Sequence, residues 1–303
     1  KMNDMFKTAF TGMRWHGYDQ VPVKQWTISY CEHNMFQIGY MAGLRPYDAY
    51  KTNYPLIKVD RPLTKTQVEM ASFIASNRHV ILAAEMGIGK SLTVIEVAEH
   101  FKKLWGSFHV FWITKGTGLP SAKLECVKWN CSLPVKFMTY EGLKKYLTEI
   151  PSGTVPPRFV IFDETQAIKN VTAQRTITAE HLARSVRACY GREYIVVAMS
   201  GTPAPKSPMD WYGLCEVVCP GFIKEGTIYA FKERLAVIES KTNAVSGGVY
   251  KELVCWRDSD KICQKCGKPE SHSNHVKGYS QDGHEFIKGI DEVSLLYKRM
   301  EGL

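Results

Sequence analysis

The chain has 303 residues, 45% hydrophobic and 23% charged, which is enough for one large or two medium-sized cores. No stretch approaches the ~18 consecutive apolar residues of a membrane span, and the polar start lacks an apolar signal segment. A formal net charge of +9 favours a polyanionic partner, nucleic acid first, although a generally basic protein is the alternative. Nine cysteines, an odd number, favour a reducing compartment over a disulfide framework. We therefore expect a monomer that is intracellular, cytoplasmic or nuclear, and neither secreted nor membrane-bound.

Residues 1–55 form the first predicted domain, a small β-rich module. Two short strands around a polar turn are expected at 13–20 and 24–28, and a short helix at 34–43. Basic and aromatic side chains occur together here, namely Arg14, Trp15, Lys24, Trp26 and Tyr30. Such surfaces stack bases and hold phosphates, and the alternative is a hairpin that packs its tryptophans into a core.

Residues 56–240 form the second predicted domain, in which short apolar strands alternate with helices. The strands are expected at 79–83, 110–114, 136–139, 159–162 and 194–199, and the helices at 65–76, 91–103, 121–129 and 141–146. This alternation predicts an α/β fold with a parallel sheet covered by helices on both faces. Ligands of such sheets bind at the carboxyl ends of the strands.

A phosphate-binding loop is predicted after the first of these strands. The chain continues there with Glu85, Met86, Gly87, Ile88, Gly89, Lys90 and Ser91. This is the Gly-x-Gly-Lys-Ser half of the P-loop (Walker A) motif, with Ala84 where the full motif has a glycine. Backbone N–H groups and the helix N-terminus would hold phosphates, Lys90 would reach the β- and γ-phosphates, and Ser91 would bind Mg²⁺. The alternative is a glycine-rich turn without a ligand.

Polar residues also follow the last two strands. Asp163 would hold Mg²⁺ and Glu164 would polarise an attacking water as general base, the Walker B role, whereas the alternative is an acidic helix N-terminus. Ser200, Gly201 and Thr202 follow the last strand. All three segments are therefore expected at one edge of the sheet, as a site for ATP and Mg²⁺.

In this order, the motifs resemble those of the Swi/Snf, remodeller-type branch of superfamily II helicases. The box at 163–170, Asp-Glu-Thr-Gln-Ala-Ile-Lys-Asn, is similar to Asp-Glu-Ala-His-x-Ile-Lys-Asn of that branch. Residues 85–91 resemble its first motif and 200–203 its third, and the resemblance covers roughly residues 61–240. It implies a RecA-like lobe that binds ATP, with Gln67 as the residue that reads adenine.

The resemblance also implies how the site is coupled to DNA and what else it needs. Ser200, Gly201 and Thr202 would couple the nucleotide site to DNA, and Gln166, where the family usually has histidine, can still hydrogen-bond toward them. Such ATPases have a second RecA-like lobe that supplies arginine fingers, and no second strand–helix series follows Thr202 in this chain. The helical pattern at 291–300 resembles the helix that ends the first lobe. The resemblance thus implies the first lobe of a helicase-like, DNA-dependent ATPase and translocase on duplex or branched DNA, poorly active without its second lobe.

An alternative function is a nucleic-acid-binding module whose nucleotide site is vestigial. The change from Ala-His to Thr165-Gln166 would then mark the decay of the site. Retention of Lys90, Asp163 and Glu164 favours the ATPase.

Residues 241–303 form the third predicted segment, an insert with a zinc-knuckle pattern. Four ligand candidates have the spacing Cys-x2-Cys-x5-His-x2-His, namely Cys263, Cys266, His272 and His275. Two thiolates and two imidazoles close a tetrahedral structural Zn²⁺ site, and Cys255 or His284 could replace one histidine. The alternative is a pair of thiols on a polar loop. The whole chain is therefore expected to be α/β, with a RecA-like P-loop sheet, an N-terminal β-hairpin module and a C-terminal zinc-knuckle-like insert.

Overall fold

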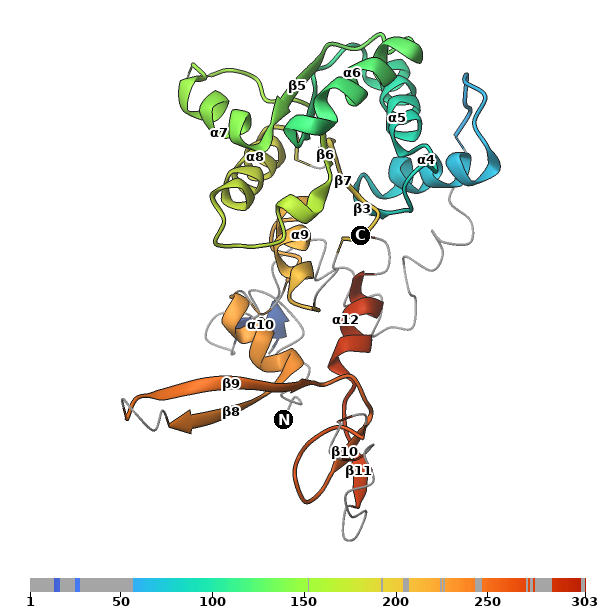
Figure 1. Ribbon diagram of the computed structural model, residues 1–303. Helices are drawn as coiled ribbons and strands as arrows, with labels where there is room; N and C mark the ends of the chain where they lie inside the picture. Colours follow the sequence, from blue (N-terminus) through green and yellow to red (C-terminus); the bar gives the residue numbers. More distant parts are fainter. Residues whose placement is uncertain are drawn as a thin grey trace. The chain divides into compact units, whose positions relative to one another are not determined.

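The computed structural model divides the chain into two compact units (Figure 1). The first comprises residues 1–224 with 302–303, and the second residues 225–301. The structure describes residues 14–16, 25–27 and 57–303, apart from 152, 192, 204–206, 224, 226, 243–246, 271, 273–274, 276–284 and 301–302. At 14–16, 25–27 and 298–299 it describes the backbone alone. The helix expected at 34–43 and the candidate ligand His284 lie outside the described residues.

The first unit is built on a five-stranded parallel sheet. In spatial order its strands are β3 (His79–Ala83), β7 (Ile195–Ser200), β6 (Phe159–Asp163), β4 (Val110–Thr114) and β5 (Val135–Thr139). The inner strands are buried along almost their whole length, as expected for a parallel sheet covered on both faces. The α/β class predicted from the alternating pattern is thereby confirmed.

Helices cover both faces of this sheet (Figure 1). One layer consists of α4 (Lys65–Asn77), α5 (Lys90–Trp105) and α6 (Leu119–Lys128). The other consists of α7 (Tyr140–Glu149), α8 (Gln174–Tyr190) and α9 (Asp210–Val218). Two short 3-10 turns, η1 (Gly116–Gly118) and η2 (Thr165–Ala167), follow β4 and β6. Within each layer the helices contact their neighbours in chain order, so each layer is continuous.

The core of the first unit lies on both faces of the three inner strands, as β4 and β6 illustrate. Because side chains alternate along a strand, Val110, Trp112, Phe159 and Ile161 point to one face and pack with α4, α5 and α6. The intervening residues of the same strands are also buried, which accounts for the uninterrupted apolar runs in the sequence.

The sequence pattern did not predict α8. Its buried face is made largely of small or polar residues: Thr176, Thr178, Ala179, Leu182, Ala183 and Val186. Such a face gives little hydrophobic periodicity, although the helix contacts both α7 and α9.

The two short strands expected near the N-terminus are present as β1 (Arg14–His16) and β2 (Gln25–Thr27). They pair antiparallel, with the Cα of Trp15 opposite that of Trp26. The N-terminal β-hairpin of the expected fold is therefore confirmed at the level of the backbone.

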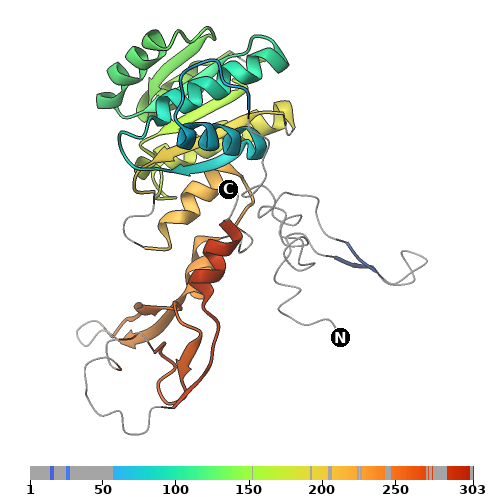
Figure 2. The same ribbon diagram turned by 90° about the vertical axis from the view of Figure 1, so that its right-hand side faces the viewer.

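In the residues that the structure describes, the second unit consists of two helices and two small antiparallel sheets, which Figure 2 shows from a second side. Its elements are α10 (Ile228–Leu235), β8 (Ala236–Thr242), β9 (Val249–Trp256), β10 (Lys261–Cys263), β11 (Phe286–Lys288) and α12 (Glu292–Met300). Helix α12 lies against α10, and the Arg234 guanidinium joins Glu225 at 2.8 Å and Glu292 at 2.7 Å. Among the described residues of either unit, no helix is long and apolar enough to cross a membrane.

Candidate nucleotide site

The order of the strands brings the three predicted segments together. Strand β7 lies between β3 and β6, with Ala83 opposite Ser200 and Asp163 opposite Met199. The backbone N–H of Ala84 also donates to the Ser200 carbonyl oxygen at 3.2 Å. The P-loop, the Asp-Glu box and the Ser-Gly-Thr segment therefore follow three adjacent strands at the same edge of the sheet.

The P-loop has the backbone that its glycines allow. Gly87 has φ +82° and Gly89 has φ +88°, in the left-handed region that other residues seldom adopt. Helix α5 begins at Lys90, so Ser91 lies in its first turn. The Lys90 ammonium donates to the carbonyl oxygens of Ala84 and Glu85, each at 2.8 Å. The lysine is therefore held within its own loop by two hydrogen bonds.

One side of the P-loop faces solvent. The Met86 side chain is 91% exposed, and Glu85 and Gly87 are exposed as well. Ile88 is half-buried, and its carbonyl oxygen points toward α4, where it accepts a hydrogen bond. The loop is thus supported on the side of α4 and open on the other.

Gln67 supports the loop from the first turn of α4. Its Oε1 accepts from the Thr64 N–H at 2.9 Å, while its own N–H donates to Oγ1 of Thr64, which makes a capping box. Its Nε2 donates to the Ile88 carbonyl oxygen at 2.9 Å. A Cβ at Gly89 would lie 2.1 Å from this Nε2. The amide of Gln67 is therefore engaged at both ends, with the helix and with the loop.

Asp163 lies half-buried at the end of β6. Burial raises the pKa of Asp163, and the nearby Lys90 ammonium opposes this rise. Burial likewise lowers the pKa of Lys90, and the charge of Asp163 opposes that change. The Tyr140 hydroxyl donates to the Asp163 carbonyl oxygen at 2.7 Å and fixes the strand end. The two charged groups thus stabilise each other in a partly desolvated place.

Glu164 has an unusual backbone for a residue with a side chain. Its φ is +53° and its ψ is +53°, and its N–H donates to Oδ1 of Asp163 at 2.9 Å. Left-handed non-glycine residues cost about 1–3 kcal/mol and occur often at functional sites. This geometry turns the Glu164 side chain away from the strand direction.

Lys115, which sequence reasoning missed, pairs with Glu164. Its ammonium lies 3.1 Å from the Glu164 carboxylate, with the side chains 41% and 37% exposed. Lys115 directly follows β4, the neighbour of β6 in the sheet. Its position after a predicted strand was the available signal, but the adjacency of the two strands was not readable from the sequence.

The box is also hydrogen-bonded to the Ser-Gly-Thr segment. The Ser200 hydroxyl donates to Oε1 of Gln166 at 3.1 Å and accepts from the Thr202 N–H at 3.0 Å. A Cβ at Gly201 would make only ordinary contacts with the P-loop backbone. Thr165 is fully buried, and its hydroxyl has no hydrogen-bond partner within the described part of the chain. The interaction expected of Gln166 is therefore present in the structure.

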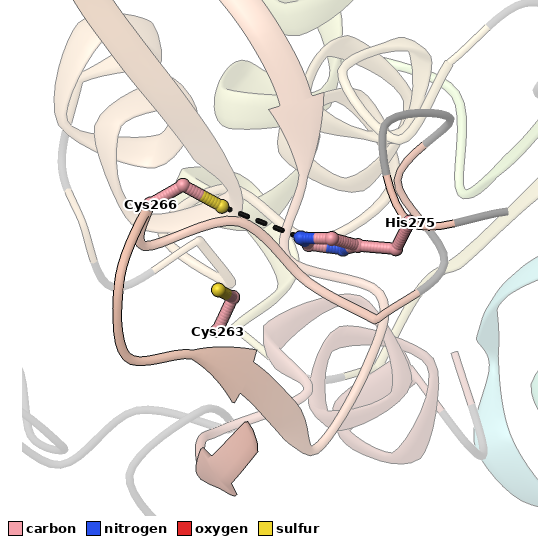
Figure 3. A group of neighbouring side chains, drawn as sticks. All are labelled: Cys263, Cys266 and His275. Atoms are coloured by element: carbon pink, nitrogen blue, oxygen red, sulfur yellow. Dashed lines mark hydrogen bonds between the residues drawn. The ribbon is translucent and has the colours of Figure 1, made fainter. Parts of the chain in front are cut away.

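Three of the four candidate zinc ligands lie together in the second unit (Figure 3). The ligand atoms of Cys263, Cys266 and His275 all lie within 4.8 Å of one another. The ring of His272 is centred 6.2 Å from that of His275, and His272 does not belong to this group of three.

Comparisons with known proteins agree with the sequence resemblance. No protein-family model matches the chain. It is 26% identical over 199 residues to the Bos taurus SWI/SNF-related matrix-associated actin-dependent regulator of chromatin subfamily A-like protein 1, covering 61% of this chain and 20% of that protein. The Drosophila melanogaster protein of the same name is 26% identical over 163 residues, covering 48% of this chain and 20% of that protein. The Sulfolobus solfataricus SWI2/SNF2 ATPase core in complex with dsDNA has a TM-score of 0.49 and 20% identity, covering 60% of this chain and 41% of that one.

The chain spans about a fifth of the length of the curated relatives it matches. Their names confirm the resemblance to Swi/Snf-type proteins.

Proposed function

We propose that this chain is the N-terminal ATP-binding lobe of a DNA-dependent ATPase that moves along duplex DNA. The observation that carries the proposal is the placement of the P-loop, the Asp163-Glu164 pair and the Ser200-Gly201-Thr202 segment at the ends of three adjacent strands. The sequence similarity to helicase-like relatives supports the same reaction class. The net charge of +9 suits a polyanionic track.

The P-loop would hold the triphosphate of ATP through its backbone N–H groups and the N-terminus of α5. Lys90 would exchange its two carbonyl partners for the β- and γ-phosphates. Ser91 and Asp163 would bind Mg²⁺, whose charge would favour the ionised form of Asp163 against the effect of burial. Gln67 would read adenine after exchanging at least one of its present hydrogen bonds.

Hydrolysis would need Glu164 as the base that orients the attacking water. Since Glu164 pairs with Lys115, this ion pair must open or turn before the carboxylate can accept a proton. An exposed pair of this kind contributes only about 0–1 kcal/mol, so binding of ATP and Mg²⁺ can open it. Gln166 and Ser200 would transmit the state of the nucleotide to Thr202 and onward to DNA.

We further propose that a second RecA-like lobe of the full-length protein covers the exposed side of the P-loop. The exposure of Met86 and Gly87 supports this, because phosphoryl transfer requires a site from which water is excluded. Arginine side chains from that lobe would stabilise the transition state. The chain of 303 residues alone should therefore hydrolyse ATP poorly, and robust turnover by it would contradict the need for a second lobe.

Localisation, oligomeric state and cofactors complete the proposal. We propose an intracellular monomer, in the cytoplasm or nucleus, with ATP and Mg²⁺ as cofactors and one structural Zn²⁺ in the second unit. The odd number of cysteines, nine, supports a reducing compartment.

The test is an ATPase assay of the full-length protein with and without duplex DNA. Lys90→Ala and Glu164→Gln should each lower DNA-stimulated turnover at least about a hundredfold, because each removes a group that acts on the transition state. Lys102→Ala is the matched control, because Lys102 lies on the same helix as Lys90 and its ammonium bonds only Ser132 among the described contacts. The turnover of this variant should equal that of the unaltered protein. Full activity in both site variants would refute the proposal.

The alternative is a nucleic-acid-binding module with a vestigial nucleotide site, and it rests on Thr165 and Gln166, which stand where the resembled family has Ala-His. Calorimetric titration of the full-length protein with ATP and Mg²⁺ separates the two functions. Absence of binding would favour a nucleic-acid-binding module.

A further inference from the structure

The geometry points to a structural zinc site in the second unit: we propose that Cys263 Sγ, Cys266 Sγ and His275 Nε2 bind one Zn²⁺, with Cys255 or His272 as the fourth ligand. This site lies beyond the ATPase function and does not depend on it. Figure 3 shows the two sulfur atoms and the imidazole turned toward a common point.

The distances suit the ion. Zinc binds sulfur at about 2.3 Å and nitrogen at about 2.0–2.1 Å, so ligand atoms around a tetrahedral ion lie about 3.5–3.8 Å apart. The three candidate ligand atoms lie within 4.8 Å of one another, and the Cys266 sulfur is 3.3 Å from Nε2 of His275. Small side-chain rotations therefore suffice to place all three on one ion.

The backbone between the two cysteines forms a tight turn. The Gly267 N–H donates to the Cys263 carbonyl oxygen at 2.8 Å, and Gly267 has φ +67°. The Cys263 N–H donates to the Lys268 carbonyl oxygen at 2.8 Å, so two backbone hydrogen bonds close the turn.

His275 is held in the tautomer that a metal ligand needs. Its Nδ1 lies 2.9 Å from the Pro269 carbonyl oxygen, which can only accept a hydrogen bond. Nδ1 therefore carries the proton, and the lone pair of Nε2 faces the Cys266 sulfur. Metal-binding histidines are commonly oriented by such a bond from the other ring nitrogen.

The second unit has little else to stabilise it. Its buried apolar residues, within the described range, are Phe231, Leu235, Ala236, Cys263 and Leu296. Several large side chains of its sheets are exposed instead: Val249, Tyr250, Phe286 and Ile287. Units with so small a core usually depend on a metal or disulfide, and zinc binding contributes folding free energy directly.

Two residues can complete the site. Cys255 lies on β9, one residue before the end of that strand at Trp256. His272 lies three residues before His275, with its ring centred 6.2 Å from that of His275. A bond from Cys255 would join β9 to the turn after β10, whereas a bond from His272 would close the turn alone.

The first test measures zinc in the full chain, purified without chelator, by elemental mass spectrometry. We expect one zinc per chain, and Cys263→Ser, Cys266→Ser and His275→Ala should each weaken zinc binding more than about a hundredfold, beyond the effect of losing a residue that only orients a ligand. Cys189→Ser and His181→Ala, at exposed residues of α8, are the matched controls and should retain zinc. A chain without zinc, or with zinc that all three variants retain, would overturn the proposal.

Because the variants could also unfold the unit, a second measurement uses the unaltered chain. Removal of zinc with a chelator should abolish hydrogen-exchange protection in β9, β10 and β11, and added Zn²⁺, but not Mg²⁺, should restore it. Protection that is indifferent to the chelator would contradict a structural site. Cobalt substitution then identifies the fourth ligand: Cys255→Ser should weaken the sulfur-to-metal charge-transfer band if it is Cys255, and His272→Ala should weaken metal binding if it is His272. Unchanged affinity in both variants would rule out the closed site proposed here.

Discussion

Replacing Gly89 by alanine should destabilise the first unit through one identifiable contact. The added Cβ would lie 2.1 Å from Nε2 and 3.2 Å from Cδ of Gln67. To make room, the Gln67 side chain must leave the Ile88 carbonyl oxygen and the Thr64 N–H, each now bonded at 2.9 Å. The substitution therefore breaks the link between α4 and the P-loop.

The magnitude follows from a comparison with Gly87. Both glycines have left-handed backbones, at φ +88° and +82°, so alanine at either should cost about 1–2 kcal/mol. A Cβ at Gly87 would meet no atom within 4 Å, so that variant carries the backbone cost alone. Alanine at Gly89 adds the loss of two neutral hydrogen bonds at about 0.5–1.5 kcal/mol each. The difference between the two variants should therefore be about 1–3 kcal/mol.

Hydrogen exchange of the amides in β4 and β6 measures this difference, because these buried strands report the unfolding free energy of the first unit. In a Gln67→Ala background there is no amide to displace, so the two glycine variants should become equally stable. Equal stability of Gly87→Ala and Gly89→Ala in the unaltered background would refute the reasoning. So would a difference that persists after Gln67 is replaced.

Three further substitutions test other features of the first unit. Arg61→Ala should cost about 3–5 kcal/mol in urea denaturation, because it leaves Glu96, 1% exposed and paired at 2.8 Å, buried without its cation. The control Lys145→Ala, at an exposed helical pair with Glu149, should cost under about 0.5 kcal/mol. Thr165→Val should raise the unfolding free energy by about 1 kcal/mol, since it removes a buried hydroxyl with no partner in the described residues, and a destabilised variant would show that the hydroxyl is satisfied. Burial raises the pKa of Asp163, so its ionised form opposes folding above that pKa and the cost disappears as pH falls to the ordinary value of 3.8. Asp163→Asn should therefore raise the unfolding free energy of the ligand-free chain at pH 7, and this gain should shrink as the pH falls. ATP and Mg²⁺ at a hundred times Kd should raise the unfolding free energy of the unaltered protein by about 2.7 kcal/mol, and the variant should lose this effect.

Much of the first unit could be predicted from the sequence because its inner strands are continuous apolar runs. Each run ends in a chemically distinct segment, so Lys90, Asp163 and Ser200 could be assigned to strand ends before the fold was known. The α8 helix could not be predicted, since its buried face relies on threonine and alanine, whose burial leaves no hydrophobic period.

Contacts between distant segments were the other part that the sequence could not supply. The insertion of β7 between β3 and β6 depends on long-range pairing, and the Lys115–Glu164 ion pair depends on β4 lying beside β6. The left-handed backbone of Glu164 has no signal in its residue type, which favours other conformations.

In the second unit, the strands could not be predicted because their side chains are largely exposed to solvent. Strand β9 is exposed along most of its length, so it lacks the alternation of a half-buried strand. The Cys-x2-Cys spacing identified Cys263 and Cys266, whereas spacing alone could not separate His275 from His272. The structure makes that distinction, because the ligand atoms of His275 and the two cysteines lie within 4.8 Å of one another and His272 is not in that group.

The order of the strands in the sheet differs from their order along the chain, so the strands cannot all pair as they are synthesised on the ribosome. Strand β3 is an edge strand whose one neighbour in the described sheet is β7, and His79 pairs with Val196. Ribosomes add about 5–20 residues per second, and His79 is separated from its partner Val196 by 196 − 79 = 117 residues. Strand β7 is therefore synthesised roughly 6 to 23 seconds after β3, and by then β4 can already pair with β5 and β6. The nascent P-loop therefore precedes most of the sheet in synthesis and is among the last segments to gain its neighbours.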